Sequence, residues 1–195
     1  MVMKIAAAVL AAGRSERFGD IKVLQKIEGK TFLEIIFEKL EILKLDTLLV
    51  YYFDEIADFV PSDIRMIKNS YPEEGQIHSI KLAIAELLNE DYDGLIVWPA
   101  DMPLIDTGTV RGIVDRALEE PRKIIAASYK GSIGHPVYFP RRKWMEIFEI
   151  HNSGVNVLVH TPETVLTETD DHFTKIGVNT KEELEKYIDE YKKGS

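Results

Sequence analysis

Near-continuous apolar runs of strand length alternate along the chain with segments of helical period. Strands are expected at residues 3–10, 47–53, 64–69, 93–99, 123–131, 135–139, 163–168 and 173–178. Helices are expected at residues 31–45, 76–90, 106–120, 140–150 and 180–194. A strand that is apolar on both faces is typical of a parallel sheet with helices on both sides. The alternation therefore predicts an α/β fold with a mostly parallel sheet, and the close strand pairs of the second half predict a small antiparallel extension.

Several short signals sharpen this assignment. Thr31 followed by Glu34 is typical of a capping box at a helix start. Asp106 or Thr107 can cap the helix that begins there, and Pro140 suits the first turn of the next one. Residues 23–27 are expected to be short and extended. The length of 195 residues is that of one domain, so residues 1–195 are expected to form a single domain.

Composition excludes several classes of function. Cysteine is absent, which excludes disulfides, thiolate catalysis and cysteine-ligated metal sites, and fits a cytoplasmic protein. The net charge is −9, which argues against nucleic acid as the main partner. No apolar run reaches the ~18 residues of a membrane span. The first apolar run ends in a glycine, an arginine and a serine rather than at a cleavage site, so neither a signal peptide nor a membrane partner is expected.

A charged loop follows the first apolar run, in the stretch VLAAGRSERFG. Gly13 lets the backbone approach a ligand closely, and Arg14 and Arg17 can donate to phosphate oxygens. Lys22 follows within the same short loop. The loop matches neither a P-loop nor a dinucleotide fingerprint. The residue types alone leave two interpretations open: a phosphate-binding loop, or a strand end with solvated charges.

Five motifs in a fixed order carry a family resemblance. They are LAAGRSERFG with the following KVL, GQIHSIKLAI (75–84), PADMPLI (99–105), GHPVYF (134–139) and GVNTKEEL (177–184). Together they resemble the sugar-nucleotide-type nucleotidyltransferases, and among these the molybdenum-cofactor nucleotidyltransferase family, over residues 5–184. The resemblance implies a Rossmann-like three-layer nucleotidyltransferase fold. It also implies transfer of a nucleoside monophosphate from a nucleoside triphosphate to a phosphorylated small-molecule acceptor, with Mg²⁺ as cofactor and pyrophosphate as product.

The resemblance also assigns roles around the nucleotide. Arg17 and Lys22 are expected to neutralise the triphosphate, and Ser79 to hydrogen-bond the base or sugar, although Ser79 can equally be a helix cap. The remaining expected nucleotide-binding residues are Leu10, Ala11, Ala12, Gly13, Arg14 and Ser15. Because an acceptor phosphate is already ionised, its attack needs no general base, and alignment with charge neutralisation supplies the catalysis.

Two oxygen donors are candidates for the metal ion. Asp101 directly follows a buried strand, where the carboxyl end of a parallel strand meets a ligand, so it is expected to be catalytic and to ligate Mg²⁺. The resemblance adds Asn179 as a second ligand. The alternatives are a turn cap for Asp101 and a helix cap for Asn179, a role for which Thr180 competes. By resemblance, His135 is expected to face the acceptor, with a structural loop histidine as the alternative.

The match is weaker on the acceptor side. In the stretch HNSGVNVLVH, Gly154 fits the family pattern, but Asn152 stands where the family has Asp and Asn156 where it has Arg. The sequence Ala11-Ala12-Gly13 looks more like the cytidylyl branch, so CTP is the preferred donor and GTP the alternative. Other open alternatives are a sugar phosphate, methylerythritol phosphate or cobinamide phosphate as acceptor. A non-catalytic nucleotide-binding factor that partners a molybdenum enzyme is also open.

Overall fold

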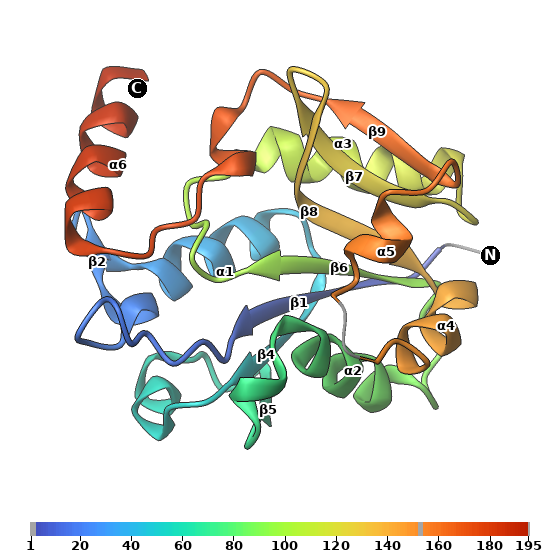
Figure 1. The fold of residues 1–195 in the computed structure, drawn as a ribbon, viewed down its shortest axis with the longest axis horizontal. Coiled ribbons are helices and arrows are strands. Elements are labelled where there is room, and N and C mark those ends of the chain that lie inside the picture. Colours follow the sequence, from blue (N-terminus) through green and yellow to red (C-terminus); the bar gives the residue numbers. More distant parts are fainter. Residues whose placement is uncertain (1–2, 152–153, 195) are drawn as a thin grey trace.

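The computed structural model describes residues 3–151 and 154–194. Within these residues the strands form a seven-stranded sheet in the order β5-β4-β1-β6-β8-β7-β9, with a separate hairpin of β2 and β3 (Figure 1). The strands are β1 (Ile5–Ala11), β2 (Lys26–Ile27), β3 (Lys30–Thr31), β4 (Asp46–Tyr51), β5 (Arg65–Lys68), β6 (Gly94–Pro99), β7 (Ile124–Tyr129), β8 (Ser132–Pro140) and β9 (Thr164–Glu168). The helices are α1 (Phe32–Ile42), α2 (Gln76–Leu87), α3 (Thr107–Glu119), α4 (Trp144–Phe148), α5 (Asn156–Val159) and α6 (Lys181–Gly194).

The sheet is mostly parallel, as the sequence predicts. β1 is an interior strand and pairs in parallel with β4 and β6, so that Ala8 lies opposite Leu48 on one side and Val97 on the other. β8 runs antiparallel to both of its neighbours, β6 and β7, and β9 pairs in parallel with β7. All residues of β1 and β6 are buried, which explains why neither strand alternates in polarity.

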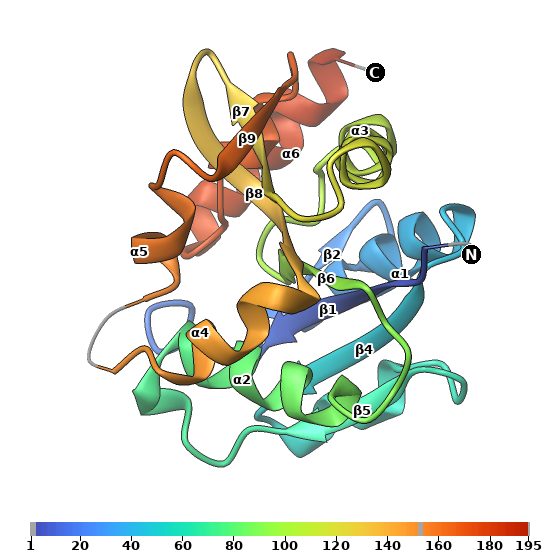
Figure 2. The ribbon, with the colours of Figure 1, turned by 90° about the vertical axis from the view of Figure 1, so that its right-hand side faces the viewer.

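Helices cover both faces of the sheet (Figure 2). On one face, apolar side chains of α1 and α3 pack with one side of the central strands. On the other face, α2 and α4 pack with the opposite side. Successive side chains of a strand point to opposite faces, so each central strand contributes to both cores. This arrangement is the three-layer fold expected from the sequence.

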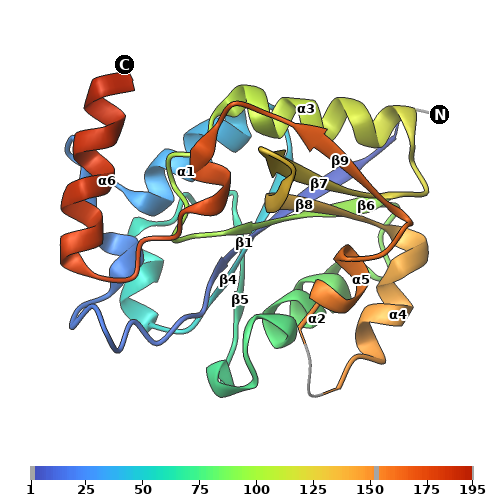
Figure 3. The same ribbon diagram turned by 45° about the horizontal axis from the view of Figure 1, so that its top comes forward.

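The last helix, α6, lies at one end of the molecule near the β2–β3 hairpin (Figure 3). Tyr187 of α6 and Val178 just before it belong to a third apolar cluster with Phe18, Ile27 and Phe32. After β9 the chain therefore returns to the carboxyl end of β1. No helix in the described ranges is long and apolar enough to cross a membrane.

Two predicted helix starts are confirmed in detail. The Thr31 hydroxyl accepts from the Glu34 amide at 3.1 Å, and the Glu34 carboxylate accepts from the Thr31 amide at 2.7 Å, which completes the capping box. Asp106, rather than Thr107, is the cap of α3, because its carboxylate accepts from the Gly108 amide at 2.6 Å.

Two local predictions are wrong and a third is displaced by one residue. Residues 23–27 are not extended throughout, because Lys22–Leu24 form a 3₁₀ turn and only Lys26–Ile27 are strand. Pro140 lies just before the helical turn rather than in it: it pairs with Gly94 at the end of β8 and is the N-cap of the 3₁₀ turn Arg141–Lys143 that leads into α4. Residues 173–178 are not a strand.

The physical reason for the last error is Asp171. Its carboxylate accepts from the Phe173 amide at 2.9 Å and its carbonyl accepts from the Thr174 hydroxyl at 2.9 Å, which favours a 3₁₀ turn over His172–Lys175. Beyond this turn the chain leaves the sheet and passes Asp101, whose carbonyl accepts from the Val178 amide at 2.9 Å.

Candidate active site

A pocket of about 240 Å³, called here the first pocket, lies where β1 and β6 end. Carboxyl ends of parallel strands are where α/β sheets bind ligands. The site residues predicted from the sequence that line it are Leu10, Ala11, Ala12, Gly13, Ser15, Lys22, Ser79 and Asp101. Sequence reasoning missed Ile21, Val23, Phe53, Pro72, Gly75 and Gln76 in the same lining. Phe53 could have been found, because it follows the carboxyl end of β4, next to β1.

The loop after β1 folds back on itself around Ser15. The Ser15 carbonyl accepts from the amides of Phe18 and Gly19 at 2.9 and 3.3 Å, and its hydroxyl accepts from the Lys22 amide at 3.2 Å. Ser15 adopts a φ of 53°, a left-handed conformation that tightens the turn. The effect of this turn is to direct the chain at Lys22 back toward the end of β1.

Lys22 lies between two oxygen donors from distant parts of the chain. Its Nζ atom is 2.9 Å from Oδ2 of Asp101 and 3.1 Å from Oδ1 of Asn179. The side chains of Lys22 and Asp101 are mostly shielded from solvent, with exposed fractions of 14% and 26%. The Asp101 and Asn179 oxygens therefore converge on one position large enough for a cation.

The position of the Lys22 ammonium indicates whether a divalent ion fits between the Asp101 and Asn179 oxygens. The Lys22 ammonium is a positive group held by both oxygens, so it stands in for a cation there. Mg²⁺ takes one or two carboxylates, keeps several waters and binds substrate phosphates. No cluster of three or more histidine or acidic side chains that could hold a metal ion exists in the described part of the chain. Asp101 and Asn179 thus fit a hard divalent ion whose other ligands are water and phosphate.

Asn179 also has contacts within its own segment. Its amide nitrogen Nδ2 donates to the Gly177 carbonyl at 3.1 Å, and its backbone amide donates to the Glu183 carboxylate at 2.6 Å. The hydroxyl of Thr180 accepts from the Glu183 amide at 3.1 Å. Thr180, rather than Asn179, therefore caps the last helix. The side-chain oxygen of Asn179 faces Lys22 instead.

Ser79 lies inside α2 rather than at its start. It is buried, and its hydroxyl accepts from Nδ2 of Asn69 at 2.9 Å. Gly75 occupies the cap position, with φ at 77°, which excludes the plain helix-cap interpretation of Ser79. Asn69 is itself held through its side-chain oxygen, which accepts from the Tyr71 amide at 2.9 Å.

The two loop arginines are not in the lining of the first pocket. Arg14 donates to the Glu73 carboxylate at 2.7 Å and lies 3.6 Å from Glu16. This pair joins the β1 loop to the 3₁₀ turn at Pro72–Glu74, so it connects the two rims of the first pocket. Arg17 is exposed, and no acidic partner is found for it among the described residues.

A second pocket, of about 260 Å³, adjoins the first. Gln76 lines both pockets, and Met102 of the second pocket directly follows Asp101 of the first. His135 lies in the second pocket, as does Lys175, which sequence reasoning missed. Burial lowers the pKa of His135 to about 4, with the nearby charge of Lys175 acting in the same direction and Asp101 opposing it. His135 is therefore neutral near pH 7. Within the described residues its Nδ1 atom is buried without a hydrogen-bond partner.

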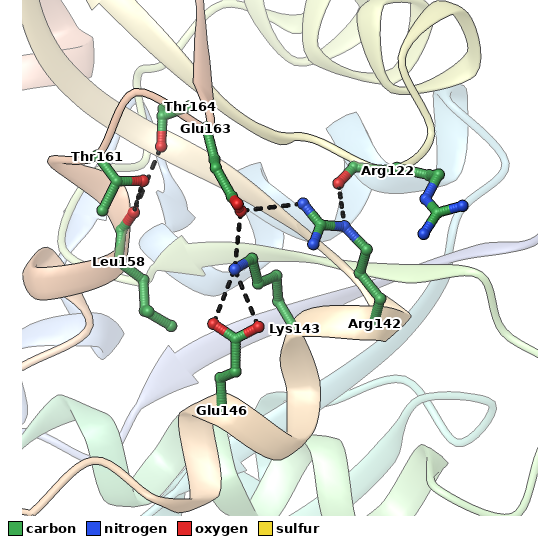
Figure 4. Close-up of polar contacts among 8 residues, drawn as sticks. All are labelled: Arg122, Arg142, Lys143, Glu146, Leu158, Thr161, Glu163 and Thr164. Atoms are coloured by element: carbon green, nitrogen blue, oxygen red, sulfur yellow. Dashed lines mark hydrogen bonds and ion pairs between the residues drawn. The ribbon is translucent and has the colours of Figure 1, made fainter.

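One wall of the second pocket is α5, which contributes Asn156. The chain after α5 is tied down by Glu163, which accepts from Lys143 at 2.8 Å and from Arg142 at 3.0 Å (Figure 4). Lys143 also binds Glu146, at 2.7 Å. Asn152, the other departure from the family pattern, lies outside the described residues.

Comparison with known proteins identifies the family. Residues 7–165 match the protein family described as the MobA-like NTP transferase domain. The chain belongs to this family. The matched region runs from β1 to the start of β9 and includes the residues that line the first pocket, Lys22 and Asp101 among them. Asn179 lies outside the matched region.

Two curated relatives of this MobA-like chain are named probable molybdenum cofactor guanylyltransferase. That of Natranaerobius thermophilus is 24% identical over 67% of this chain and 63% of its own length. That of a Geobacillus species is 30% identical over 65% of this chain and 65% of its own length. The chain thus spans slightly less than two thirds of these relatives.

Solved structures show the same fold. A manganese complex of Rv0371C from Mycobacterium tuberculosis has a TM-score of 0.77 at 20% identity, covering 96% of this chain and 99% of that one. A molybdopterin-guanine dinucleotide biosynthesis protein A from Archaeoglobus fulgidus has a TM-score of 0.72 at 18% identity, covering 98% and 100%. The MobA-like family and the nucleotidyltransferase fold expected from the sequence are therefore confirmed.

Proposed function

We propose that this MobA-like chain is a metal-dependent nucleotidyltransferase that transfers a nucleoside monophosphate to a phosphate of a small-molecule acceptor. The observation that carries the proposal is the convergence of Asp101 and Asn179 on Lys22: Lys22 and Asp101 line the first pocket, and Asn179, outside its lining, contacts Lys22. A cation held by two oxygen donors beside a pocket suits a metal–triphosphate and few other ligands. A Mg²⁺ ion bound there neutralises phosphate charge and helps to hold the reacting groups in line.

The proposed roles of the chain's own residues follow from their positions. The backbone at Ala11, Ala12 and Gly13 lies along the base and ribose, and Ser79 offers its hydroxyl to them. Lys22 moves from Asp101 and Asn179 to the phosphates, where it offsets their negative charge. An acceptor phosphate oxygen attacks the α-phosphorus, a new P–O bond forms, and the bond to the β-phosphate breaks, releasing pyrophosphate.

The second pocket is the proposed acceptor site. It joins the first pocket at Gln76, and neutral His135 can exchange hydrogen bonds with an acceptor without adding charge. Lys175 supplies a positive group for an acceptor phosphate. The relatives' names support a molybdenum-cofactor acceptor. Asn156, where the family has Arg, makes the other phosphorylated acceptors necessary comparisons.

The donor base is a choice between GTP and CTP. The names of the two guanylyltransferase relatives described above support GTP, whereas the residues Ala11, Ala12 and Gly13 support CTP. GTP is therefore the first nucleotide to test, with CTP as the paired alternative.

The test measures pyrophosphate release with each nucleoside triphosphate, Mg²⁺ and each acceptor in turn. Molybdopterin, a sugar phosphate, methylerythritol phosphate and cobinamide phosphate form the acceptor panel. Asp101→Asn is expected to abolish release, while Asp115→Asn, on the exposed side of α3, is the matched control and retains it. Nucleotide binding without release, for every pairing, would instead support a non-catalytic nucleotide-binding factor.

A further inference from the structure

The segment that carries Asp101 lies between β6 and α3 and has no strand partner. Its carbonyls are nevertheless bound by donors from elsewhere in the chain. The Asp101 carbonyl accepts from the Val178 amide at 2.9 Å, and the Met102 carbonyl accepts from Nε1 of Trp98 at 3.0 Å. Buried carbonyls need such partners, because leaving them unpaired costs free energy.

Lys39 of α1 supplies the other two donors. Its Nζ atom donates to the Pro103 carbonyl at 2.8 Å and to the Ile105 carbonyl at 2.7 Å. One ammonium group thus holds two carbonyls of the segment that leads from Asp101 to Asp106, the cap of α3. The same lysine connects this turn to α1, which packs on the sheet beneath it.

The environment of Lys39 is unfavourable for a charged lysine, because it removes the ammonium from water. Burial lowers its pKa to about 8, against the opposing effects of Asp106 and Asp171. No carboxylate in the described part of the chain lies within ion-pair distance of its ammonium. An apolar side chain would pack there without this desolvation, so helix packing alone does not explain the amine. Its hydrogen bonds to the two carbonyls do.

We propose that Lys39 is a positioning residue that fixes the 101–105 segment, and through it the Asp101 carboxylate opposite Lys22 and Asn179. The part of this proposal that concerns metal binding rests on the proposed function. Lys39 touches neither nucleotide nor metal. Its effect passes through the backbone of Pro103 and Ile105 to Asp101.

Trp98 gives a direct readout of the segment, because its indole nitrogen donates to the Met102 carbonyl. The chain has two tryptophans, so ¹⁹F NMR of 5-fluorotryptophan protein resolves Trp98 from Trp144, with Trp144→Phe for assignment. Lys39→Met is expected to shift the Trp98 resonance and leave the Trp144 resonance in place. Lys39→Arg, which keeps the donors, is expected to restore the wild-type position. If Lys39→Met does not fold, Lys39→Gln replaces it.

The second measurement is the affinity for Mn²⁺ in the presence of GTP or CTP, by electron paramagnetic resonance. Lys39→Met is expected to weaken Mn²⁺ binding by about tenfold, as loss of a group that orients a ligand does. Lys81→Met is the matched control, because Lys81 is also half-buried and donates to a carbonyl, that of Ile150 at 2.8 Å. It is expected to change neither the Trp98 resonance nor the Mn²⁺ affinity.

A folded Lys39→Met protein (or Lys39→Gln, where it replaces Lys39→Met) with the wild-type Trp98 resonance and wild-type Mn²⁺ affinity overturns the proposal. Equal shifts of both tryptophans also overturn it, because they indicate a general loss of packing. If the wild-type protein binds no metal–nucleotide and releases no pyrophosphate, the proposed function fails. The Trp98 resonance of the nucleotide-free protein still decides whether Lys39 fixes the segment.

Discussion

The ammonium of Lys22 lies 2.9 Å from the carboxylate of Asp101, although 79 residues separate them along the chain. They meet because β1 and β6 are parallel neighbours, so the segments that follow both strands leave from the same edge of the sheet. In the absence of a metal ion, Lys22 neutralises Asp101. A divalent cation that binds Asp101 must displace this ammonium, so Lys22 and the metal compete for one position.

Removal of Lys22 is therefore expected to have opposite effects on metal binding and on turnover. In Lys22→Met, Mn²⁺ binds the nucleotide-free protein more tightly, because no ammonium competes for Asp101. The rate of pyrophosphate release falls by roughly 100-fold, the usual loss when a group that stabilises transition-state charge is removed. Metal titration by electron paramagnetic resonance and a pyrophosphate assay measure the two effects. Weaker metal binding together with normal turnover contradicts this role.

Asn179→Asp is expected to tighten metal binding. The substitution adds a negative charge to the donor set without lengthening the side chain, and affinity for divalent ions rises with the charge of the ligands. Mn²⁺ titration of the nucleotide-free protein measures the change, with Asn156→Asp in the second pocket as the control for added charge. An equal gain in both variants, or none in Asn179→Asp, would show that residue 179 does not face the ion.

His135 is expected to make the protein less stable in acid. Burial lowers its pKa from 6.5 to about 4, so between these values the unfolded chain binds a proton that the folded chain does not. The free energy of unfolding therefore falls as the pH falls through this window, by about 3 kcal/mol in total from this histidine.

Urea unfolding of wild type and His135→Gln at pH 7 and pH 4.5 measures this contribution. The other titrating groups contribute equally to both proteins, so the difference between the two pH dependences reports His135 together with its charged neighbours Asp101 and Lys175. Wild type is expected to lose more stability than the variant on acidification. Parallel losses contradict the assignment of a neutral, half-buried His135.

Glu163 is expected to affect the acceptor but not the nucleotide. Its carboxylate anchors the chain after α5 through Lys143 and Arg142, and these cations hold its pKa below the usual range. Glu163→Gln is expected to raise KM for the acceptor by about tenfold, within the range that small misplacements of binding groups produce. The nucleotide KM stays constant. Glu119→Gln, in an exposed ion pair with Arg116 on α3, is the control. A rise in both KM values, or in neither, rules out this role.

Local signals predicted much of the fold. The continuous apolar run at β1 predicted a buried central strand, and Thr31 with Glu34 predicted a helix start to the residue. The error at residues 173–178 arose where a side chain competes for the backbone hydrogen bonds that a strand would use. Residues 173–178 have the apolar content of a strand, but Asp171 bonds to the backbone around Phe173 and turns the chain away from the sheet.

The site could be predicted where it follows from strand order. Lys22 and Asp101 both follow central strands, so their proximity could be predicted from the sequence. The partner of Arg14 was not, because Glu73 lies 59 residues away in a 3₁₀ turn that no periodic pattern marks. The role of Lys39 could not be predicted either, because its acceptors are backbone carbonyls, which carry no residue-specific signal in the sequence.

The decisive measurement is the anomalous scattering of manganese in crystals grown with MnCl₂ and either GTP or CTP. We expect a manganese peak within coordinating distance of the Asp101 carboxylate and the Asn179 side-chain oxygen, with the Lys22 ammonium moved onto the phosphates. A nucleotide bound in the first pocket while Lys22 remains between the two oxygens, with manganese elsewhere, contradicts a metal–triphosphate site at this position.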